Sequence, residues 1–260
     1  GSVSVGTAVN ITADFTDPGT SDSQTATIDW GDATSGSGVV SGSGAMRTVA
    51  ANHSYPAGGS YAISVRVADD DGGSGTVMTS NQITGVGLAG DVLRIVGSAS
   101  IDRVTVTKRG KTQVSVSATF LAGGPKTFAI VSVQRIVATL CDGNDFLSIT
   151  PSLAIPAVLD GGNGNDQLKG GGASVILIGG SGNDSLTGSK QRDVIVGGLG
   201  SDQLNGLAED DLLIAGSTAF DANQAALDSI LAEWSSVRSY GARIANLRGT
   251  GAGSSFISRL

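Results

Sequence analysis

Residues 161–214 read GGNGNDQLK, GGGASVILI, GGSGNDSLT, GSKQRDVIV, GGLGSDQLN and GLAEDDLLI, six nine-residue units in direct succession. The better units follow the pattern Gly-Gly-x-Gly-x-Asp-x-apolar-x, and no residue is inserted or lost between neighbours. Six residues of such a unit can form a tight turn, and the next three a short strand whose middle side chain points inward. The register therefore predicts a regular stack of turns and strands.

Two units make one turn of a flattened right-handed coil, and stacking the turns pairs strand with strand. Glycine suits the positions where the backbone takes a positive φ or approaches the next turn too closely for a Cβ. The inward position of every unit is apolar, which predicts a ladder-like core: Leu168, Leu177, Leu186, Ile195, Leu204 and Leu213.

The sixth position carries an aspartate that recurs every 18 residues on each edge of the coil. Asp166, Asp184 and Asp202 form one column, the first edge, whereas Asp193 and Asp211 belong to the second edge. Stacked turns lie about 4.8 Å apart, so these carboxylates repel one another unless a cation lies between them. Calcium accepts about six to eight oxygen ligands from carboxylates and backbone carbonyls. We therefore expect Ca²⁺ between successive aspartates of the first edge.

The glycine-rich turns are expected to supply the carbonyl ligands: Gly162, Gly164, Gly180, Gly182, Gly198 and Gly200. One further turn precedes the array, because CDGNDFL at residues 141–147 matches the second half of a unit, with Asp145 at the ligand position and Leu147 inward. Asp145 lies 21 residues before Asp166, which is one 18-residue turn plus a three-residue insertion that we place in 149–156. A third ion on the first edge is therefore expected.

The second edge is less regular. Its turn at 170–175 has Val175 in place of the aspartate, and Lys190, Arg192 and Glu209 crowd the other two turns. At best Asp193 and Asp211 share a weak site, so a metal-free second edge is favoured, with Lys190 or Arg192 as a candidate to replace the metal. A solenoid whose turns satisfy their backbone groups without any metal stays open as the alternative, whereas a phosphate-binding loop would need GxxxxGK[ST].

The repeat resembles the RTX, or haemolysin-type, nonapeptide repeat of secreted bacterial proteins, over residues 161–214 with an outlying copy at 143–147. The resemblance implies a parallel β-roll, calcium ligation by the matching turns and folding after export. It does not by itself imply toxin activity.

Residues 1–85 follow a different pattern, with apolar residues at alternating positions in three stretches around Val9–Phe15, Ala26–Trp30 and Tyr61–Val67. Turn signals such as DPG at 17–19 and DDDGG at 69–73 separate these stretches. The pattern predicts an antiparallel, immunoglobulin-like β-sandwich.

Three stretches of this part carry a second resemblance: IDWGD at 28–32, HSY at 53–55 followed by GSYAISV at 59–65, and VADDDGG at 67–73. Together they are similar to a PKD domain, although the usual glycine after WGD is Ala33 here. That family implies an extracellular sandwich that acts as a spacer or adhesion module and sometimes contacts polysaccharide or a surface protein. Packing or hydrogen bonding is the expected role of Trp30 and His53. The acidic run at 69–71 could hold a cation, but a solvated turn is favoured.

The fold class predicted for the whole chain is all-β with a small helical C-terminal cap, an immunoglobulin-like sandwich followed by an RTX-type solenoid. Residues 86–140 are expected to be non-repetitive strands that lead into a calcium-binding roll at 141–216 and cover its N-terminal end. Residues 217–250 are expected to form a helical cap whose apolar stripe covers the last coil, beginning at a capping Asp221. Residues 251–260 resemble a linker, and we expect the chain to be a piece of a longer protein.

Composition narrows the class of function. Forty glycines in 260 residues with only five prolines and a net charge of −7 suit a turn-dense acidic solenoid. The lone Cys141 excludes an internal disulfide, and the absence of a Cys/His cluster argues against zinc. No apolar run approaches the roughly 20 residues of a membrane span. The one basic cluster, Lys108, Arg109 and Lys111, is expected to be a solvated hairpin tip rather than a nucleic-acid contact.

Two classes of function remain. The first is a non-catalytic, calcium-binding extracellular module, an adhesion or structural segment of a large secreted or cell-surface bacterial protein. The second is the export and stability region of a secreted hydrolase whose catalytic domain lies outside these residues. His53 is the only histidine, which removes a Ser-His-Asp triad, and the repeat accounts for most clustered acids. We therefore expect no enzyme activity.

Overall fold

The computed structural model describes residues 3–19 and 23–249, and the chain divides into two compact units at the boundary between residues 87 and 88. Each unit is described by itself. The predicted linker at 251–260 lies outside the described residues.

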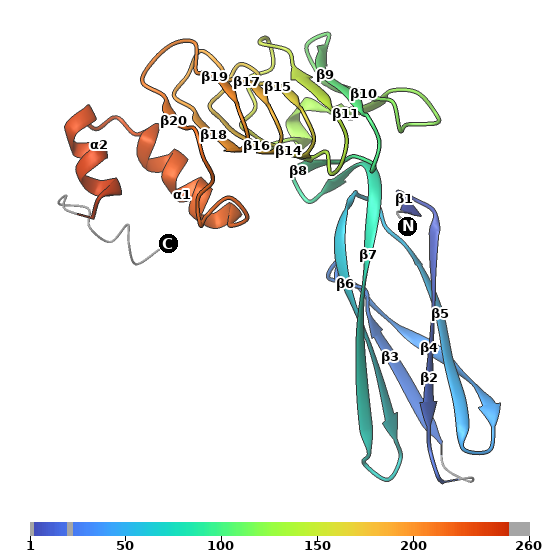
Figure 1. Cartoon of the computed structure of the whole chain (residues 1–260). Helices are drawn as coiled ribbons and strands as arrows, with labels where there is room; N and C mark the ends of the chain where they lie inside the picture. Colours follow the sequence, from blue (N-terminus) through green and yellow to red (C-terminus); the bar gives the residue numbers. More distant parts are fainter. Residues whose placement is uncertain (1–2, 20–22, 250–260) are drawn as a thin grey trace. The chain divides into compact units, whose positions relative to one another are not determined.

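The first unit is an antiparallel sandwich (Figure 1) whose strands are hydrogen-bonded in the order β2-β5-β4-β3-β6-β7, with β1 parallel to β7. The three strands that alternation predicts are β2, β3 and β6. The bounds are β1 (Val3–Ser4), β2 (Ala8–Thr16), β3 (Gln24–Asp29), β4 (Ser35–Ser43), β5 (Met46–Ser54), β6 (Gly59–Asp69) and β7 (Ser74–Ala89).

The core of the sandwich gathers around its aromatic residues. Trp30 is 4% exposed, and its carbonyl oxygen accepts a hydrogen bond from the Tyr55 hydroxyl at 2.9 Å. The His53 ring stacks on Trp30 and its Nε2 lies 2.8 Å from Asp32 Oδ2. These side chains pack and hold the loop after β3, as expected. Ala33 has a φ of +68°, a conformation that explains why glycine suits this position.

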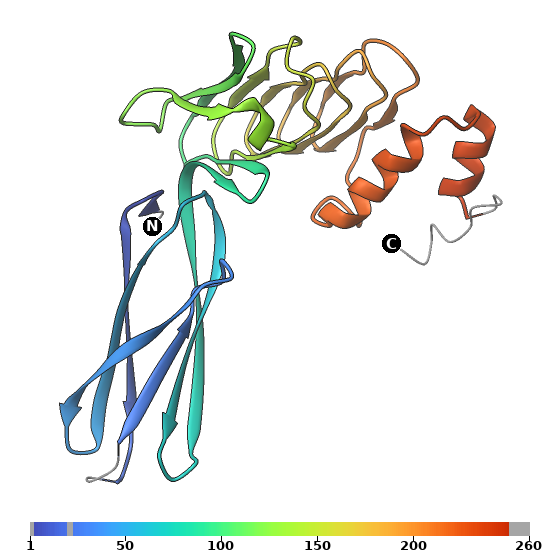
Figure 2. The ribbon, with the colours of Figure 1, turned by 180° about the vertical axis from the view of Figure 1, so that it is seen from behind.

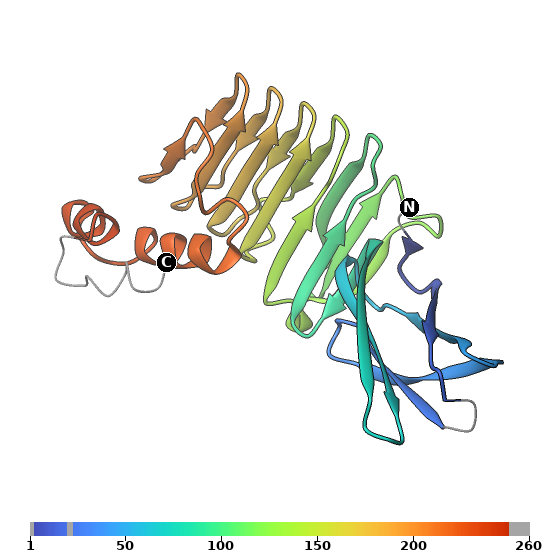
Figure 3. The same ribbon diagram turned by 60° about the horizontal axis from the view of Figure 1, so that its bottom comes forward.

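The second unit is a β-roll of two facing sheets, which confirms the predicted solenoid. Strands of one sheet recur in register at 18-residue intervals, for example Ile176 with Val194 and Val194 with Leu212. We call β8-β12-β14-β16-β18-β20 the helix-side sheet and β11-β10-β9-β13-β15-β17-β19 the polar sheet. Figure 3 shows the parallel strands stacked side by side.

The strand bounds of the helix-side sheet are β8 (Val92–Val96), β12 (Arg135–Thr139), β14 (Ala157–Asn163), β16 (Val175–Ser181), β18 (Val194–Leu199) and β20 (Leu212–Ile214). Those of the polar sheet are β9 (Arg103–Arg109), β10 (Gln113–Ala118), β11 (Lys126–Ala129), β13 (Phe146–Ile149), β15 (Gln167–Lys169), β17 (Ser185–Thr187) and β19 (Gln203–Asn205). A 3-10 turn, η1 (Ile130–Ser132), follows β11.

Part of the 86–140 segment belongs to the roll itself. Strands β8 and β12 are parallel to each other, and β9 is parallel to β13, so both continue the stack of coils. The antiparallel hairpin of β10 and β11 extends the polar sheet beyond β9 and thereby pairs its edge (green in Figure 2).

The inward ladder is as predicted except at its last rung. The inward side chains of the earlier coils are fully buried: Leu147, Leu168, Leu177, Leu186 and Ile195. Leu204 is half-buried, and Leu213 is 47% exposed, contrary to the prediction. Within the described residues no further coil stacks on β19 and β20.

Two helices follow the roll, α1 (Gln224–Trp234) and α2 (Tyr240–Leu247). The cap of α1 is Asn223, whose side chain accepts a hydrogen bond from Ala226 N, so the predicted capping role of Asp221 is wrong. Asp221 instead accepts from the backbone N–H and hydroxyl of Thr218 in the preceding turn.

The apolar stripe of α1 lies on the outward face of the helix-side sheet rather than over the last coil. One buried cluster joins this face to α1: Val158, Ile176, Ile178, Val194, Val196 and Leu227, with Leu212, Ile214, Phe220, Ile230 and Leu231 packed against it. The reason is readable in the repeat, because strands such as β16 (VILIGGS) are apolar on both faces, whereas β15 (QLK) is apolar only inward. A sheet with two apolar faces needs a second covering layer.

Candidate metal centre

The complete turns of the first edge share one backbone conformation. Their second and fourth residues all have φ between +97° and +132°: Gly162, Gly164, Gly180, Gly182, Gly198 and Gly200. A Cβ on Gly180 would lie 2.0 Å from the carbonyl oxygen of Gly162, and one on Gly182 would lie 2.0 Å from that of Gly164. Both carbonyl oxygens therefore point from one turn toward the next, through a space that only glycine leaves open.

The sixth-position aspartates lie in one buried column. Asp145, Asp166 and Asp184 are each 2% exposed. Oδ1 of each later aspartate accepts the backbone N–H of the aspartate one coil earlier, at 2.8 Å for Asp145 to Asp166, 2.8 Å for Asp166 to Asp184 and 3.0 Å for Asp184 to Asp202. The structure thus brings together the four first-edge aspartates that the repeat predicts.

The second oxygen of each carboxylate has no hydrogen-bond partner. Buried and unpaired are the Oδ2 atoms of Asp145, Asp166, Asp184 and Asp202. Because a buried acceptor without a partner is costly, a whole column of them requires a physical explanation.

In the three complete turns, the unpaired oxygen lies near a carbonyl of the next turn. A Cβ on Gly161 would lie 2.3 Å from Asp166 Oδ2 and 2.7 Å from the carbonyl oxygen of Gly179. The corresponding contacts at Gly179 are 2.3 Å to Asp184 Oδ2 and 2.3 Å to the carbonyl oxygen of Gly197. Carboxylate and carbonyl oxygens converge here, a donor set that suits a hard cation such as Ca²⁺.

Burial also raises the pKa values of this column. Desolvation raises the pKa of Asp145 and of Asp184 to about 6, and neighbouring carboxylates add to the effect. Desolvation also raises the pKa of Asp166. A cation at the unpaired oxygens would oppose both the desolvation and the repulsion.

A ladder of side-chain amides, not predicted from the sequence, fixes the spacing of the turns. Asn144 Oδ1 accepts from Asn165 N at 2.8 Å, Asn165 Oδ1 accepts from Asn183 N at 2.7 Å, and Asn183 Oδ1 accepts from Ser201 N at 2.8 Å. Asparagine at the fifth position of alternate units, Asn165 and Asn183, was the available signal. The ladder holds adjacent turns in register beside the aspartate column.

The outlying turn at 140–145 has the same shape with a different residue. Its second position is Cys141 with a φ of +77°, and its fourth is Gly143 with a φ of +143°. Only the second position therefore lacks the glycine that this conformation favours. The turn places Asp145 in the column despite the longer spacing to Asp166.

The second edge satisfies its carboxylate differently. Asp193 is fully buried, and its Oδ1 accepts from Val175 N at 2.8 Å and from the Ser189 hydroxyl at 2.9 Å. Its Oδ2 accepts from Ser189 N at 2.5 Å. Asp193 N in turn donates to Asp211 Oδ1 at 2.9 Å. Both oxygens of Asp193 therefore already have donors from the protein.

The expectation that Lys190 or Arg192 takes the place of a metal is wrong. Arg192 forms an ion pair with Glu209 at 3.6 Å and donates to the carbonyl oxygen of Ser236 at 3.0 Å, and Lys190 is exposed. The donors at Asp193 come from Ser189, which sequence reasoning passed over.

The first-edge column has one more member that was missed. Asp102 N donates to Asp145 Oδ1 at 2.7 Å, so Asp102 lies one coil before Asp145. Residues 97–105, GSASIDRVT, form a degenerate unit with glycine first, aspartate sixth and Val104 inward. The signal was its likeness to GSKQRDVIV at 188–196, which an intervening hairpin obscures.

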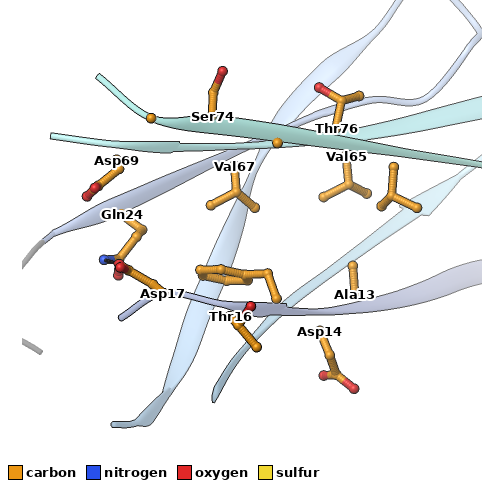
Figure 4. A pocket seen from close by; sticks show the side chains of 14 residues that line it. Ala13, Asp14, Thr16, Asp17, Gln24, Val65, Val67, Asp69, Ser74 and Thr76 are labelled. Atoms are coloured by element: carbon orange, nitrogen blue, oxygen red, sulfur yellow. Dashed lines mark hydrogen bonds between the residues drawn. The ribbon is translucent and has the colours of Figure 1, made fainter. Parts of the chain in front are cut away.

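The sandwich has a hollow of its own, between β2 and the paired strands β6 and β7, with a volume of about 470 Å³. Figure 4 shows Val65 and Val67 pointing into it, whereas Asp14, Ser74 and Thr76 point away. At one end Gln24 Nε2 donates to Asp17 Oδ2. The hollow is thus an apolar gap between two sheets with a polar rim.

The acidic turn at 69–71 brings three carboxylates within 4.8 Å of one another. Asp70 Oδ2 accepts from the Ser23 hydroxyl at 3.1 Å, and Asp69 Oδ1 accepts from Asp70 N at 2.9 Å. These bonds belong to an exposed hydrogen-bonded turn, which agrees with the expected solvated role.

Comparison with known families matches both parts of the chain. Residues 160–195 and 178–213 match the RTX calcium-binding nonapeptide repeat, and residues 1–84 match the PKD domain. Neither the curated proteins nor the solved structures include a significant match to the chain. The chain therefore carries a PKD domain followed by RTX repeats, two non-catalytic domain types, in the predicted order. Among the described residues, no helix is long and apolar enough to cross a membrane.

Proposed function

We propose that this chain is a calcium-dependent structural module of a secreted or cell-surface protein, with Ca²⁺ bound along the first edge of its roll. The observation that carries the proposal is the column of buried, unpaired Oδ2 atoms, which in the three complete turns lie near a carbonyl oxygen of the next turn. One ion for each neighbouring pair would use Asp145 with Asp166, Asp166 with Asp184, and Asp184 with Asp202.

The ligands of these sites would be the aspartate Oδ2 atoms with the nearby carbonyl oxygens of Gly179 and Gly197. The carbonyls of the second and fourth glycines of the complete turns, which the repeat predicts as ligands, would add to them. When bound, calcium supplies positive charge that neutralises the column. The residues of this chain supply the rest: glycines open the gaps, the asparagine ladder sets their spacing, and the backbone N–H groups orient Oδ1. The polypeptide would thus offer carboxylate and carbonyl oxygens to an ion from neighbouring turns.

Coupling between the ions and the fold gives the module its use. Ligands that bind the folded state alone stabilise it, and a carboxylate column without cations opposes folding. The roll would remain weakly folded at the low calcium concentration inside a cell and become rigid outside, where calcium is abundant. This supports an extracellular location and a role after export.

The PKD domain would serve as a spacer or as the adhesive part of the module. Its family type supports contact with polysaccharide or with a surface protein. Retention of residues 1–87 on a panel of immobilised glycans would support adhesion, and no retention on any of them would leave the spacer role. An export and stability region of a secreted hydrolase would use the same calcium chemistry, with the catalytic domain elsewhere in the parent protein.

The test is a calcium titration, followed by circular dichroism and calorimetry, on the wild type and on Asp184→Ala. Asp184 would serve two neighbouring sites, so its loss should remove more than one bound ion and blunt the structural transition. Calcium sites of extracellular modules have Kd values of about 10⁻⁴–10⁻³ M, which sets the range to scan. Asp71→Ala, an exposed acid of the sandwich, is the matched control. A wild type that stays folded and binds no calcium would refute the proposal.

A further inference from the structure

Two turns of the roll share the pattern Gly-Ser-x-x-x-Asp and the same set of hydrogen bonds. In both, the serine backbone N–H donates to Oδ2 of the aspartate of its own turn, at 2.6 Å for Ser98 to Asp102 and 2.5 Å for Ser189 to Asp193. The serine hydroxyl donates to Oδ1 of the same aspartate, at 3.2 Å and 2.9 Å.

The hydroxyl oxygen also accepts a bond within the turn. The donor is the backbone N–H of the fourth residue, at 3.2 Å for Ser100 and 2.9 Å for Gln191. Neither serine has the positive φ found at the second position of the complete turns, where glycine stands. The second residue of the turn therefore decides where its N–H points.

The contrast with the complete turns concerns one atom. Oδ2 has no partner in Asp166 and Asp184, whereas in Asp102 and Asp193 it receives the serine N–H. Asp102 and Asp193 are equally buried, at 2% and 0% exposure, so solvent does not account for the difference. The serine supplies hydrogen-bond donors at the position where the complete turns leave an acceptor open.

We propose that the Gly-Ser-x-x-x-Asp turns are metal-independent equivalents of the calcium turns, in which serine occupies with its N–H and hydroxyl the role that a cation has elsewhere. Asp102 and Asp193 then hold their coils without an ion, and serine at the second position determines which aspartates are not ligands. The first-edge part of this inference rests on the proposed calcium function.

The two serine turns stand at different places in the roll. Asp102 begins the first-edge column, and its Oδ1 also accepts from the Thr119 hydroxyl at 3.1 Å, in the turn that follows β10. Asp193 lies in the middle of the second edge and joins three coils, because it accepts from Val175 N and donates to Asp211. The serine turn at 97–102 thus pairs the aspartate that begins the first-edge column. The serine turn at 188–193 pairs an aspartate of the second edge.

The rival explanation is that the serine hydroxyls and these aspartates are themselves calcium ligands. Ser98→Ala and Ser189→Ala in the full chain separate the two, with Ser217→Ala, an exposed serine that follows β20, as control. Native mass spectrometry in saturating calcium counts the bound ions, and hydrogen exchange reports the backbone N–H groups of residues 98, 100, 189 and 191.

The proposal predicts an unchanged number of ions in both variants and faster exchange at the N–H of residue 100 or 191, which loses the serine hydroxyl as acceptor. The N–H of residue 98 or 189 keeps its aspartate acceptor and serves as the internal reference. One lost hydrogen bond corresponds to an acceleration of about tenfold. Loss of an ion from either variant would overturn the inference, as would unchanged exchange in both.

Asp193→Asn provides a second test in case a serine variant does not fold. It keeps the shape of the side chain and removes its charge. The proposal predicts the wild-type number of ions for Asp193→Asn. An ion lost in this variant would show that Asp193 is a ligand. The exchange readout also separates this inference from the proposed function. A wild type that binds no calcium would refute the proposed function alone. The altered exchange of the serine variants would still support metal-free hydrogen bonding in the two serine turns.

Discussion

The complete turns of the first edge and the serine turn of the second edge share a nine-residue register and a sixth-position aspartate, yet the carboxylates of these turns have different partners. On the first edge Asp166 and Asp184 keep one oxygen unpaired inside the protein, whereas on the second edge Asp193 has donors on both. The residue at the second position makes the difference, because glycine leaves the gap open and serine fills it. A repeat motif therefore specifies the scaffold, and one neighbouring residue specifies whether Oδ2 of the aspartate receives a hydrogen bond from its own turn.

The second edge is also tied to the helices after the roll. The Arg243 side chain is 2% exposed, and its guanidinium lies 2.7 Å from Asp210 Oδ2 and over the ring of Trp234 at 5.1 Å. Trp234 Nε1 donates to the carbonyl oxygen of Asp210 at 2.7 Å. Protein contacts thus hold this edge at its last turn, while nothing comparable covers the described first edge.

Removal of calcium should have the largest effect and should act unequally on the two edges. We expect chelation to accelerate hydrogen exchange at the backbone N–H groups of Asp166 and Asp184 more than at those of Val175 and Asp193. All four donate to carboxylates, so they form a matched set. Equal acceleration at the two edges would mean that the roll responds as a single unit and that the contrast has no energetic consequence.

Gly180→Ala should come next, because its Cβ would lie 2.0 Å from the carbonyl oxygen of Gly162 and its φ is +103°. Strain of this kind costs on the order of 1–3 kcal/mol from the backbone conformation alone, and the clash adds to it. Gly216→Ala is the control, since nothing lies within 4 Å of its Cβ position. Urea unfolding in saturating calcium measures both, and equal stabilities would contradict the tight packing of the turns.

Arg243→Met should destabilise the second edge without changing calcium binding at the first. Asp210 is 53% exposed, so the ion pair is partly screened, and we expect a loss of about 1–2 kcal/mol from the ion pair and the ring contact together. Thermal unfolding gives the loss, and calorimetry gives the number and affinity of ions. Weaker calcium binding in Arg243→Met would show that the two edges are coupled.

The smallest effect is expected from pH. Burial raises the pKa of Asp145, Asp184 and Asp193 to about 6, above the roughly 3.9 of an unfolded aspartate. Between these values the folded, calcium-free chain binds more protons than the unfolded chain, so its stability falls as pH rises from about 4 through about 6. We expect the calcium-free roll to melt at a higher temperature at about pH 5.5 than at about pH 7.5. Saturating calcium should narrow the difference, and a melting temperature that rises with pH would contradict the raised pKa values.

The periodic residues made much of the architecture predictable. The 18-residue recurrence of Asp166, Asp184 and Asp202 places them in one column whatever the details of the turns. Asp102 escaped prediction because its unit lacks the second and fourth glycines and a hairpin separates it from the array. Strand β4 was missed for a similar reason, since its glycine–serine sequence resembles a linker. Yet a Cβ on Gly38 would lie 2.5 Å from Val49 Cγ1, so the core requires glycine there.

The position of α1 was a different kind of error. The apolar stripe of Leu227, Ile230 and Leu231 shows that the helix packs against something, but not against which surface. An open end and an apolar sheet face compete for it. The sheet face offers more apolar area, because Ile176 and Ile178 repeat one coil later as Val194 and Val196. Comparing the outward residues of alternate strands would have decided the question.

The packing of α1 on the outward face of the helix-side sheet has an evolutionary consequence. Strands β16, β18 and β20 present the same pair of outward apolar positions, so an in-frame duplication or deletion of 18 residues would renew the surface on which the helix lies. The number of coils can therefore change between descendants without redesign of the helix. Selection can therefore change the length of the aspartate column separately from the packing of α1.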